Sequence, residues 1–178
     1  MTAEPKGDDG TRRDFIYIAT GAFATVGAGI ATWPFIDQMN PAADVLALAS
    51  LEVDISGIQP GHALTVKWRG KPVFIRHRTP DEVQQARAVN VADLRDPVRD
   101  EDRVQQAEWL IVVGICTHLG CIPLGVKETD PKGDFDGYFC PCHGSHYDSS
   151  ARVRKGPAPR NLEVPAYEFL TPTLVKIG

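Results

Sequence analysis

The chain has 178 residues, enough for one domain of ordinary size with a short appendage, and a formal net charge of −4. Its basic residues form no long run, which argues against a nucleic-acid partner, because phosphate binding needs a concentrated positive surface. The 16 glycines and 14 prolines are too few for a disordered chain and suit a β-rich domain with many turns.

Residues 15–36 form an uncharged apolar stretch. As a helix rising about 1.5 Å per residue it would span a hydrocarbon core of roughly 30 Å. Arg12 and Arg13 precede it and resemble a twin-arginine export signal, and no small-residue cleavage site follows. We interpret the stretch as an uncleaved membrane anchor; a buried core helix and a cleaved signal are the alternatives. The positive-inside rule then places residues 1–14 in the cytoplasm and the rest outside.

Residues 37–50 follow the anchor and include a run of small side chains. This segment is either a flexible hinge linker or a plain spacer, and the sequence favours neither.

From residue 51 onward the pattern is typical of a small β domain. Thr79, Pro80 and Glu82 have the spacing of a helix start with a capping box, which predicts one short helix to about residue 89. Alternation and β-branched residues predict strands at residues 51–55, 63–68, 72–77, 109–115, 138–140, 162–164, 167–170 and 174–177.

All four cysteines lie in two short motifs, CTHLGC at residues 116–121 and CPCHGSHY at residues 140–147. Each motif supplies one Cys and one His on a loop interrupted by Gly or Pro, a pattern that points to a metal site. The candidate ligands are Cys116, His118, Cys140 and His143. His146 is a weaker rival to His143.

The donor set fits a tetrahedral zinc site as well as a Rieske-type [2Fe–2S] cluster. Zinc fingers usually pair like ligands in each half of the motif, whereas each half here is mixed. A mixed half lets one iron take both thiolates and the other both imidazoles. Neutral imidazoles leave the oxidised cluster uncharged, whereas four thiolates would give it a charge of −2. Reduction is therefore easier, and the pattern favours one high-potential [2Fe–2S] cluster.

Two further pairs of side chains lie within these motifs. Cys121 and Cys142 are either free buried thiols or a disulfide that joins the two loops, and an exported compartment favours the disulfide. Ser145 and Tyr147 carry hydroxyls that can hydrogen-bond to sulfur and raise the potential. Their alternative roles are turn formation and packing.

The two motifs, together with Gly156-Pro157-Ala158-Pro159, the paired Arg and the anchor, resemble the Rieske iron–sulfur subunit of ubiquinol–cytochrome c reductases. The resemblance implies an all-β head of small antiparallel sheets at residues 51–178, with a cluster-binding subdomain at about residues 110–160. It also implies that Cys116 and Cys140 bind one iron, that His118 and His143 bind the other, and that Cys121 and Cys142 form a disulfide. His143 would contact quinol, while Leu119, Gly120 and residues 156–159 would cover the cluster.

The resemblance further implies a place in a dimeric complex with a cytochrome b subunit and a c-type cytochrome, oxidising ubiquinol with proton translocation. The protein would span the inner membrane of a bacterium once, with its head in the periplasm. A Rieske subunit of another exported oxidase, such as arsenite oxidase, is the main alternative. Rieske ferredoxins and oxygenases lack the second cysteine pair and usually the anchor, and a structural zinc protein would have no redox role.

Overall fold

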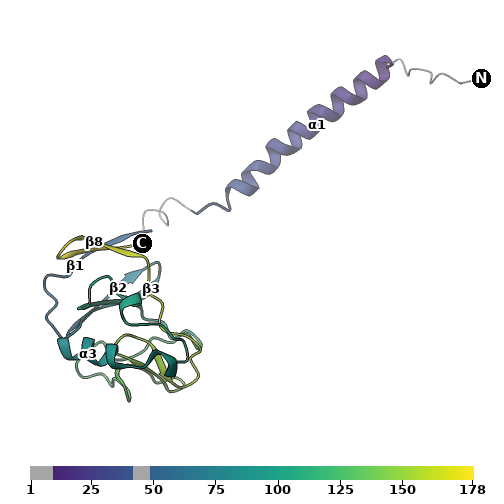
Figure 1. The fold of residues 1–178 in the computed structure, drawn as a ribbon. Helices are drawn as coiled ribbons and strands as arrows, with labels where there is room; N and C mark the ends of the chain where they lie inside the picture. The colour runs from purple at the N-terminus through teal and green to yellow at the C-terminus, as the bar shows by residue number, and fades with distance from the viewer. Residues whose placement is uncertain (1–9, 42–48) are drawn as a thin grey trace, which may run out of the picture. The chain divides into compact units, whose positions relative to one another are not determined.

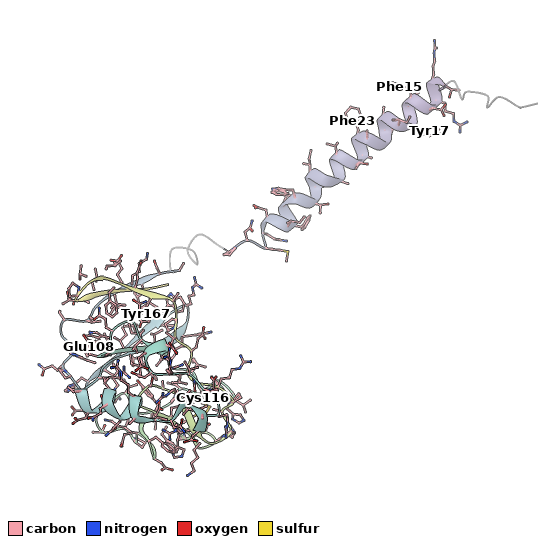
Figure 2. All side chains as sticks on the ribbon, in the orientation of Figure 1. Phe15, Tyr17, Phe23, Glu108, Cys116 and Tyr167 are labelled. Atoms are coloured by element: carbon pink, nitrogen blue, oxygen red, sulfur yellow. A yellow bond between two sulfur atoms is a disulfide. The ribbon has the colours of Figure 1, made fainter. Side chains whose placement is uncertain are left out.

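The computed structural model describes residues 10–41 and 49–178, and contact clustering divides the chain into two units, Met1–Leu46 and Ala47–Gly178. In the first unit, helix α1 (Arg12–Asp37) begins at a capping box in which Thr11 and Asp14 satisfy each other's backbone N–H groups. None of its side chains is buried, and Phe15, Tyr17 and Phe23 project freely from it (Figure 2). Its length and hydropathy are sufficient to cross a membrane.

The second unit, here called the head, contains three antiparallel three-stranded sheets (Figure 1). Sheet A has the order β1 (Leu51–Asp54), β9 (Leu174–Ile177), β8 (Tyr167–Thr171). Sheet B has the order β2 (Ala63–Trp68), β3 (Lys71–His77), β4 (Trp109–Val113). Sheet C has the order β5 (Asp136–Cys140), β6 (Ser145–Asp148), β7 (Val153–Lys155).

Strands β3 and β4 separate two hydrophobic cores. Successive side chains of a strand point to opposite faces, so Ile75 and its partner Ile111 enter one core while Phe74 and its partner Val112 enter the other. All five residues of β4 are buried for this reason. The base core, against sheet A, consists of Val53, Ile55, Val73, Ile75, Trp109, Ile111, Val113, Val175 and Ile177. The site core, on the other face, consists of Phe74, Leu110, Val112, Cys116, Tyr138, Cys140, Tyr147, Ala151, Val153, Ala158 and Leu162.

The connection from β3 to β4 contains helix α3 (Pro80–Ala88) and two short 3-10 helices, η1 (Val91–Asp93) and η2 (Glu101–Arg103). The predicted capping box is present, with the Thr79 hydroxyl accepting from the Glu82 N–H and the Glu82 carboxylate accepting from the Thr79 N–H. The Glu82 carboxylate also pairs with the buried Arg76 of β3. This ion pair fastens the helix to sheet B.

The predicted fold class, an all-β head of small antiparallel sheets with one short α-helix and an N-terminal apolar helix, is confirmed. Two details differ. Residues 162–164 form no strand, although the Glu163 carbonyl accepts one hydrogen bond from the Val113 N–H. Strands β6 and β7 were not predicted, because neither SHYD nor VRK shows apolar alternation. Half of the proposed hinge of residues 37–50, namely residues 42–48, lies outside the described residues.

Candidate metal centre

The two Cys/His motifs form loops that are closed by the same backbone hydrogen bond. The first loop (residues 116–121) follows β4, and the second loop (residues 140–145) joins β5 to β6. In each, a glycine four positions after the first cysteine donates its N–H to that cysteine's carbonyl, from Gly120 to Cys116 and from Gly144 to Cys140, both at 3.0 Å. Both glycines have positive φ, 83° and 72°, a conformation that is costly for residues with a Cβ.

A disulfide between Cys121 and Cys142 joins the first loop to the second. Cys116 and Cys140 remain free, and both are buried. The sulfur of Cys140 lies within 4.8 Å of both disulfide sulfurs. Because those two sulfurs are bonded to each other, only Cys140 in this group can offer a thiolate to a metal.

The two loops also bring two imidazoles together. The rings of His118 and His143 have centroids 4.6 Å apart and lie at 83° to each other. Nδ1 of His118 is buried and has no hydrogen-bond partner among the described residues, whereas His143 is exposed. A buried polar atom without a partner is rare, and this imidazole nitrogen on the first loop is available to bind a metal.

His146, the rival ligand, is already engaged elsewhere. Its Nδ1 accepts a hydrogen bond from the Asp134 N–H at 3.0 Å, and its ring packs edge-on against Phe139, with centroids 4.9 Å apart. These contacts hold the ring against sheet C and the loop before it, so the geometry favours His143.

The Cys116 sulfur accepts a hydrogen bond that favours its negatively charged form. The buried Tyr147 hydroxyl donates to Cys116 Sγ at 3.2 Å, and burial together with this bond raises the pKa of Tyr147. Burial opposes ionisation of Cys116, but hydrogen bonds, foremost from Tyr147 and including one from Ser145, lower the pKa of that thiol. The pKa of Cys140 is raised, mainly by burial. The site therefore stabilises negative charge on the Cys116 sulfur.

Residues 156–159, here called the proline loop, pack against the second loop. Gly156 has φ +93°, and a Cβ there would lie 2.3 Å from the Gly144 carbonyl oxygen, so only glycine fits. The buried Ala158 donates its N–H to the Ser145 hydroxyl oxygen at 3.1 Å. Leu119 on the first loop is 72% exposed, which leaves an apolar side chain facing outward next to the imidazoles.

Several residues that support these loops were not identified from the sequence. The Thr117 hydroxyl donates to the Arg160 carbonyl at 2.6 Å. Asp96 accepts from the backbone N–H of Asn161 through its carboxylate and from the Asn161 side chain through its carbonyl. Arg95 donates to carbonyls of the proline loop. These contacts join residues 43 to 65 positions apart, and no local sequence pattern reports them.

The predicted ligand residues fit a [2Fe–2S] cluster. Two buried free thiols, one buried imidazole nitrogen without a partner and a second imidazole beside it form a set of two anionic and two neutral donors. This is the set that Rieske clusters use, although four-ligand zinc sites use it as well. The geometry alone is therefore compatible with either a [2Fe–2S] cluster or a zinc ion, and the similarity to known proteins decides between them.

Residues 53–168 match the family described as the Rieske [2Fe-2S] domain, and residues 2–42 match the TAT signal of ubiquinol–cytochrome c reductase Fe-S subunits. The chain is 66% identical over 177 residues to the ubiquinol–cytochrome c reductase iron–sulfur subunit of Rhodospirillum rubrum, covering 99% of this chain and 97% of that one. It is 55% identical to the subunit of the same name from Bradyrhizobium diazoefficiens, covering 100% of both.

The chain belongs to the family of ubiquinol–cytochrome c reductase iron–sulfur subunits. A chain of a solved structure titled "Hyperthermophilic respiratory Complex III" also resembles it, with a TM-score of 0.52 and 27% identity over 89% of this chain and 98% of that one. The cofactor of this Rieske iron–sulfur subunit is one [2Fe–2S] cluster, which excludes the structural zinc protein. The alternative of another exported oxidase is not favoured, because the curated relatives that the chain matches over nearly its whole length are reductase subunits.

Proposed function

We propose that this Rieske subunit takes electrons from ubiquinol and passes them to a c-type cytochrome within a membrane quinol–cytochrome c reductase. Cys116 and Cys140 bind one iron, and His118 and His143 bind the other. The observation that carries the proposal is the meeting of two buried free thiols and two adjacent imidazoles on loops joined by the Cys121–Cys142 disulfide. When bound there, the cluster supplies a one-electron acceptor of high potential.

The protein's own groups set the charge and orientation of the site. Tyr147 donates to the Cys116 sulfur, so the thiolate keeps a fixed partner when an electron increases the negative charge nearby. Ser145 is buried and pairs with Cys140 across β5 and β6, and its hydroxyl oxygen accepts a hydrogen bond from the Ala158 N–H. Both hydroxyls favour the reduced state and raise the potential.

The difference in exposure between the imidazoles supports His143 as the quinol contact. His143 is exposed, while His118 is only partly exposed. His143 therefore accepts the hydrogen bond from the quinol hydroxyl and takes its proton as the electron leaves. The exposed side chain of Leu119, with Gly120 beside it, gives the apolar surface that meets the cytochrome b subunit around the quinol.

The N-terminal unit supplies the membrane anchor. Helix α1 crosses the inner membrane of a bacterium once, with Arg12 and Arg13 on the cytoplasmic side and the head in the periplasm. The partners are the cytochrome b and c-type cytochrome subunits of a dimeric complex, in which quinol oxidation releases protons and contributes to translocation. Residues 37–50 act as the hinge that lets the head reach both partners.

The ligand assignment is tested by two histidine variants of the full-length protein in membranes. His143→Ala is expected to remove the [2Fe–2S] EPR signal, acid-labile sulfide and quinol–cytochrome c turnover. His146→Ala is the matched control, because it removes an imidazole three positions away that already bonds to Asp134, and it should retain all three. Loss of the signal in His146→Ala with retention in His143→Ala would contradict the assignment. Wild-type protein that contains zinc in place of iron and sulfide would refute the function itself.

A further inference from the structure

Arg95 contacts the proline loop from a distant part of the chain. It lies just after η1, and its Nη1 donates to the carbonyl of Gly156 and to that of Ala158, the latter at 2.7 Å. A single guanidinium nitrogen thus binds the carbonyls on both sides of Pro157. Within the part of the chain that the structure describes, Arg95 forms no ion pair, so its charge is directed to these backbone oxygens alone.

The loop that Arg95 holds is in direct contact with Ser145. Gly156 packs against Gly144 and Ser145 closely enough to exclude a Cβ. Ala158 donates its N–H to the Ser145 oxygen, and both residues are buried. A hydroxyl oxygen that accepts from a fixed N–H has its rotation restricted, and its own hydrogen must point to another acceptor. The contacts therefore run from Arg95 through the Ala158 amide to the hydroxyl of Ser145, the residue that pairs with Cys140 across β5 and β6.

A second attachment makes the effect of Arg95 separable from folding. The Asn161 N–H donates to the Asp96 carboxylate at 2.9 Å, and the Asn161 side chain accepts from the Val153 N–H, also at 2.9 Å. These bonds hold the end of the loop whether or not Arg95 is present. Arg95 itself is exposed, so replacing it creates no cavity in the site core.

We propose that Arg95 is a positioning residue for the redox centre: it fixes the carbonyls of Gly156 and Ala158 so that the Ala158 N–H orients the Ser145 hydroxyl toward the centre's sulfur. The inference rests on the proposed ligand set and adds a residue outside both motifs. Without Arg95, the Ala158 amide and the Ser145 hydroxyl become mobile, and the hydrogen bond that favours the reduced state weakens. The midpoint potential then falls while the ligands stay in place.

The test is a redox titration, followed by EPR, of full-length protein in membranes. Arg95→Gln is expected to lower the midpoint potential and to leave cluster content unchanged, and Arg95→Lys, which keeps a charged donor, to lower it less. Arg99→Gln is the matched control, since Arg99 is an exposed arginine close in sequence that pairs with Asp102 and, among residues 10–41 and 49–178, with no other acid. It should leave the potential unchanged. In a Ser145→Ala background, Arg95→Gln should cause no further shift.

Hydrogen exchange gives a second readout that does not depend on the cluster. Loss of charge-assisted bonds to the loop should speed exchange of the Ala158 amide on the order of tenfold in Arg95→Gln, with no change in Arg99→Gln. An equal fall in potential for Arg95→Gln and Arg99→Gln would mean that the loss of any nearby positive charge lowers the potential, and would overturn the proposal. An undiminished shift in the Ser145→Ala background, or unchanged Ala158 exchange, would overturn it as well. If wild-type protein lacked the [2Fe–2S] signal, the ligand assignment would fail, and the exchange result would still decide whether Arg95 holds the loop.

Discussion

The base core and the site core lie on opposite faces of sheet B and are stabilised by different interactions. The base core is made of branched aliphatic side chains and Trp109 from two sheets, and each fully buried aliphatic side chain contributes about 1.5–3 kcal/mol. The site core combines aliphatic side chains and Phe74 with thiols, tyrosines and alanines. It is bordered by the buried Arg103 and Arg152, which donate to backbone carbonyls of nearby loops and of helix α3. Burial lowers the pKa of Arg103 to about 10.

The base core contributes mainly stability, whereas the site core has to hold ligands available. The base core gains stability from strand pairing and apolar burial, which require no specific ligand. The site core must leave two thiols and an imidazole nitrogen available, so its loops are fixed by hydrogen bonds, ion pairs and a disulfide. Figure 2 places Tyr167 toward the sheet A end of the head and Cys116 toward the other end. Substitutions in the two cores should therefore have separable effects.

The largest effect is expected at Arg152, whose guanidinium pairs with the buried Asp148 and donates to the Ala86 carbonyl. Arg152→Met leaves the buried Asp148 carboxylate with its backbone N–H donors and with the more distant charge of Arg154, at 3.8 Å. Breaking a buried pair in this way costs about 3–5 kcal/mol. Chemical denaturation of the holoprotein measures the loss. Arg99→Met, which removes an exposed arginine, is the control and should change stability little. Equal stability of the two variants would contradict the role given to buried arginines.

A slightly smaller loss is expected in the base core. Ile111 is completely buried on β4, and Ile111→Ala should lower the free energy of unfolding by about 2–5 kcal/mol through lost burial and a cavity. Because Ile111 faces away from the loops, the midpoint potential and EPR spectrum of folded protein should not change. Leu170→Ala, on the partly exposed β8, is the matched control with a small effect. A shifted potential in Ile111→Ala would show that the two cores are coupled.

Loss of the disulfide should affect the site core alone. Cys121 and Cys142 are 21 positions apart, and a cross-link over such a loop contributes about 3 kcal/mol in the chain-entropy treatment. In the Cys121→Ser/Cys142→Ser variant we expect faster loss of the cluster absorption, with unchanged fluorescence of Trp68 and Trp109, which report on the base. Early exposure of these tryptophans would instead mean that the disulfide also supports the base core.

The same comparison explains what the sequence could predict. Residues 51–55 and 63–68 follow an alternating pattern typical of strands with one face toward a core, whereas residues 72–77 are buried on both faces and are predicted by their apolar and β-branched side chains. Strands β6 and β7 lack that pattern and depend on contacts from Arg152 and Asn161 that are made only in the folded chain. The candidate ligands could be predicted from the sequence because the cysteines and the candidate histidines lie together in two short motifs. Arg95 could not be, because its partners are 61 and 63 positions away.

The smallest effect concerns the ion pair between Glu82 and Arg76, which fastens α3 to sheet B. Burial raises the pKa of Glu82, but the hydrogen bond and charge of Arg76 outweigh it, so the pKa lies below the ordinary value of 4.5. A carboxyl whose pKa is lower in the folded state binds fewer protons there than in the unfolded state. Its stabilising effect is therefore complete above pH 4.5 and is lost as the pH falls toward the folded-state pKa.

Glu82→Gln tests this directly, because glutamine retains an oxygen for the capping box but has no titrating carboxyl. Unfolding curves between pH 3 and pH 6 should show a shallower loss of stability in acid for the variant than for wild type, whereas Glu168→Gln, at an exposed pair with Lys176, should keep the wild-type slope. Equal slopes for wild type and Glu82→Gln would place the acid sensitivity in other buried carboxylates, first of all Asp100. Burial raises the pKa of Asp100, but the hydrogen bond and charge of Arg78 and the charge of Arg152 together outweigh it and lower that pKa.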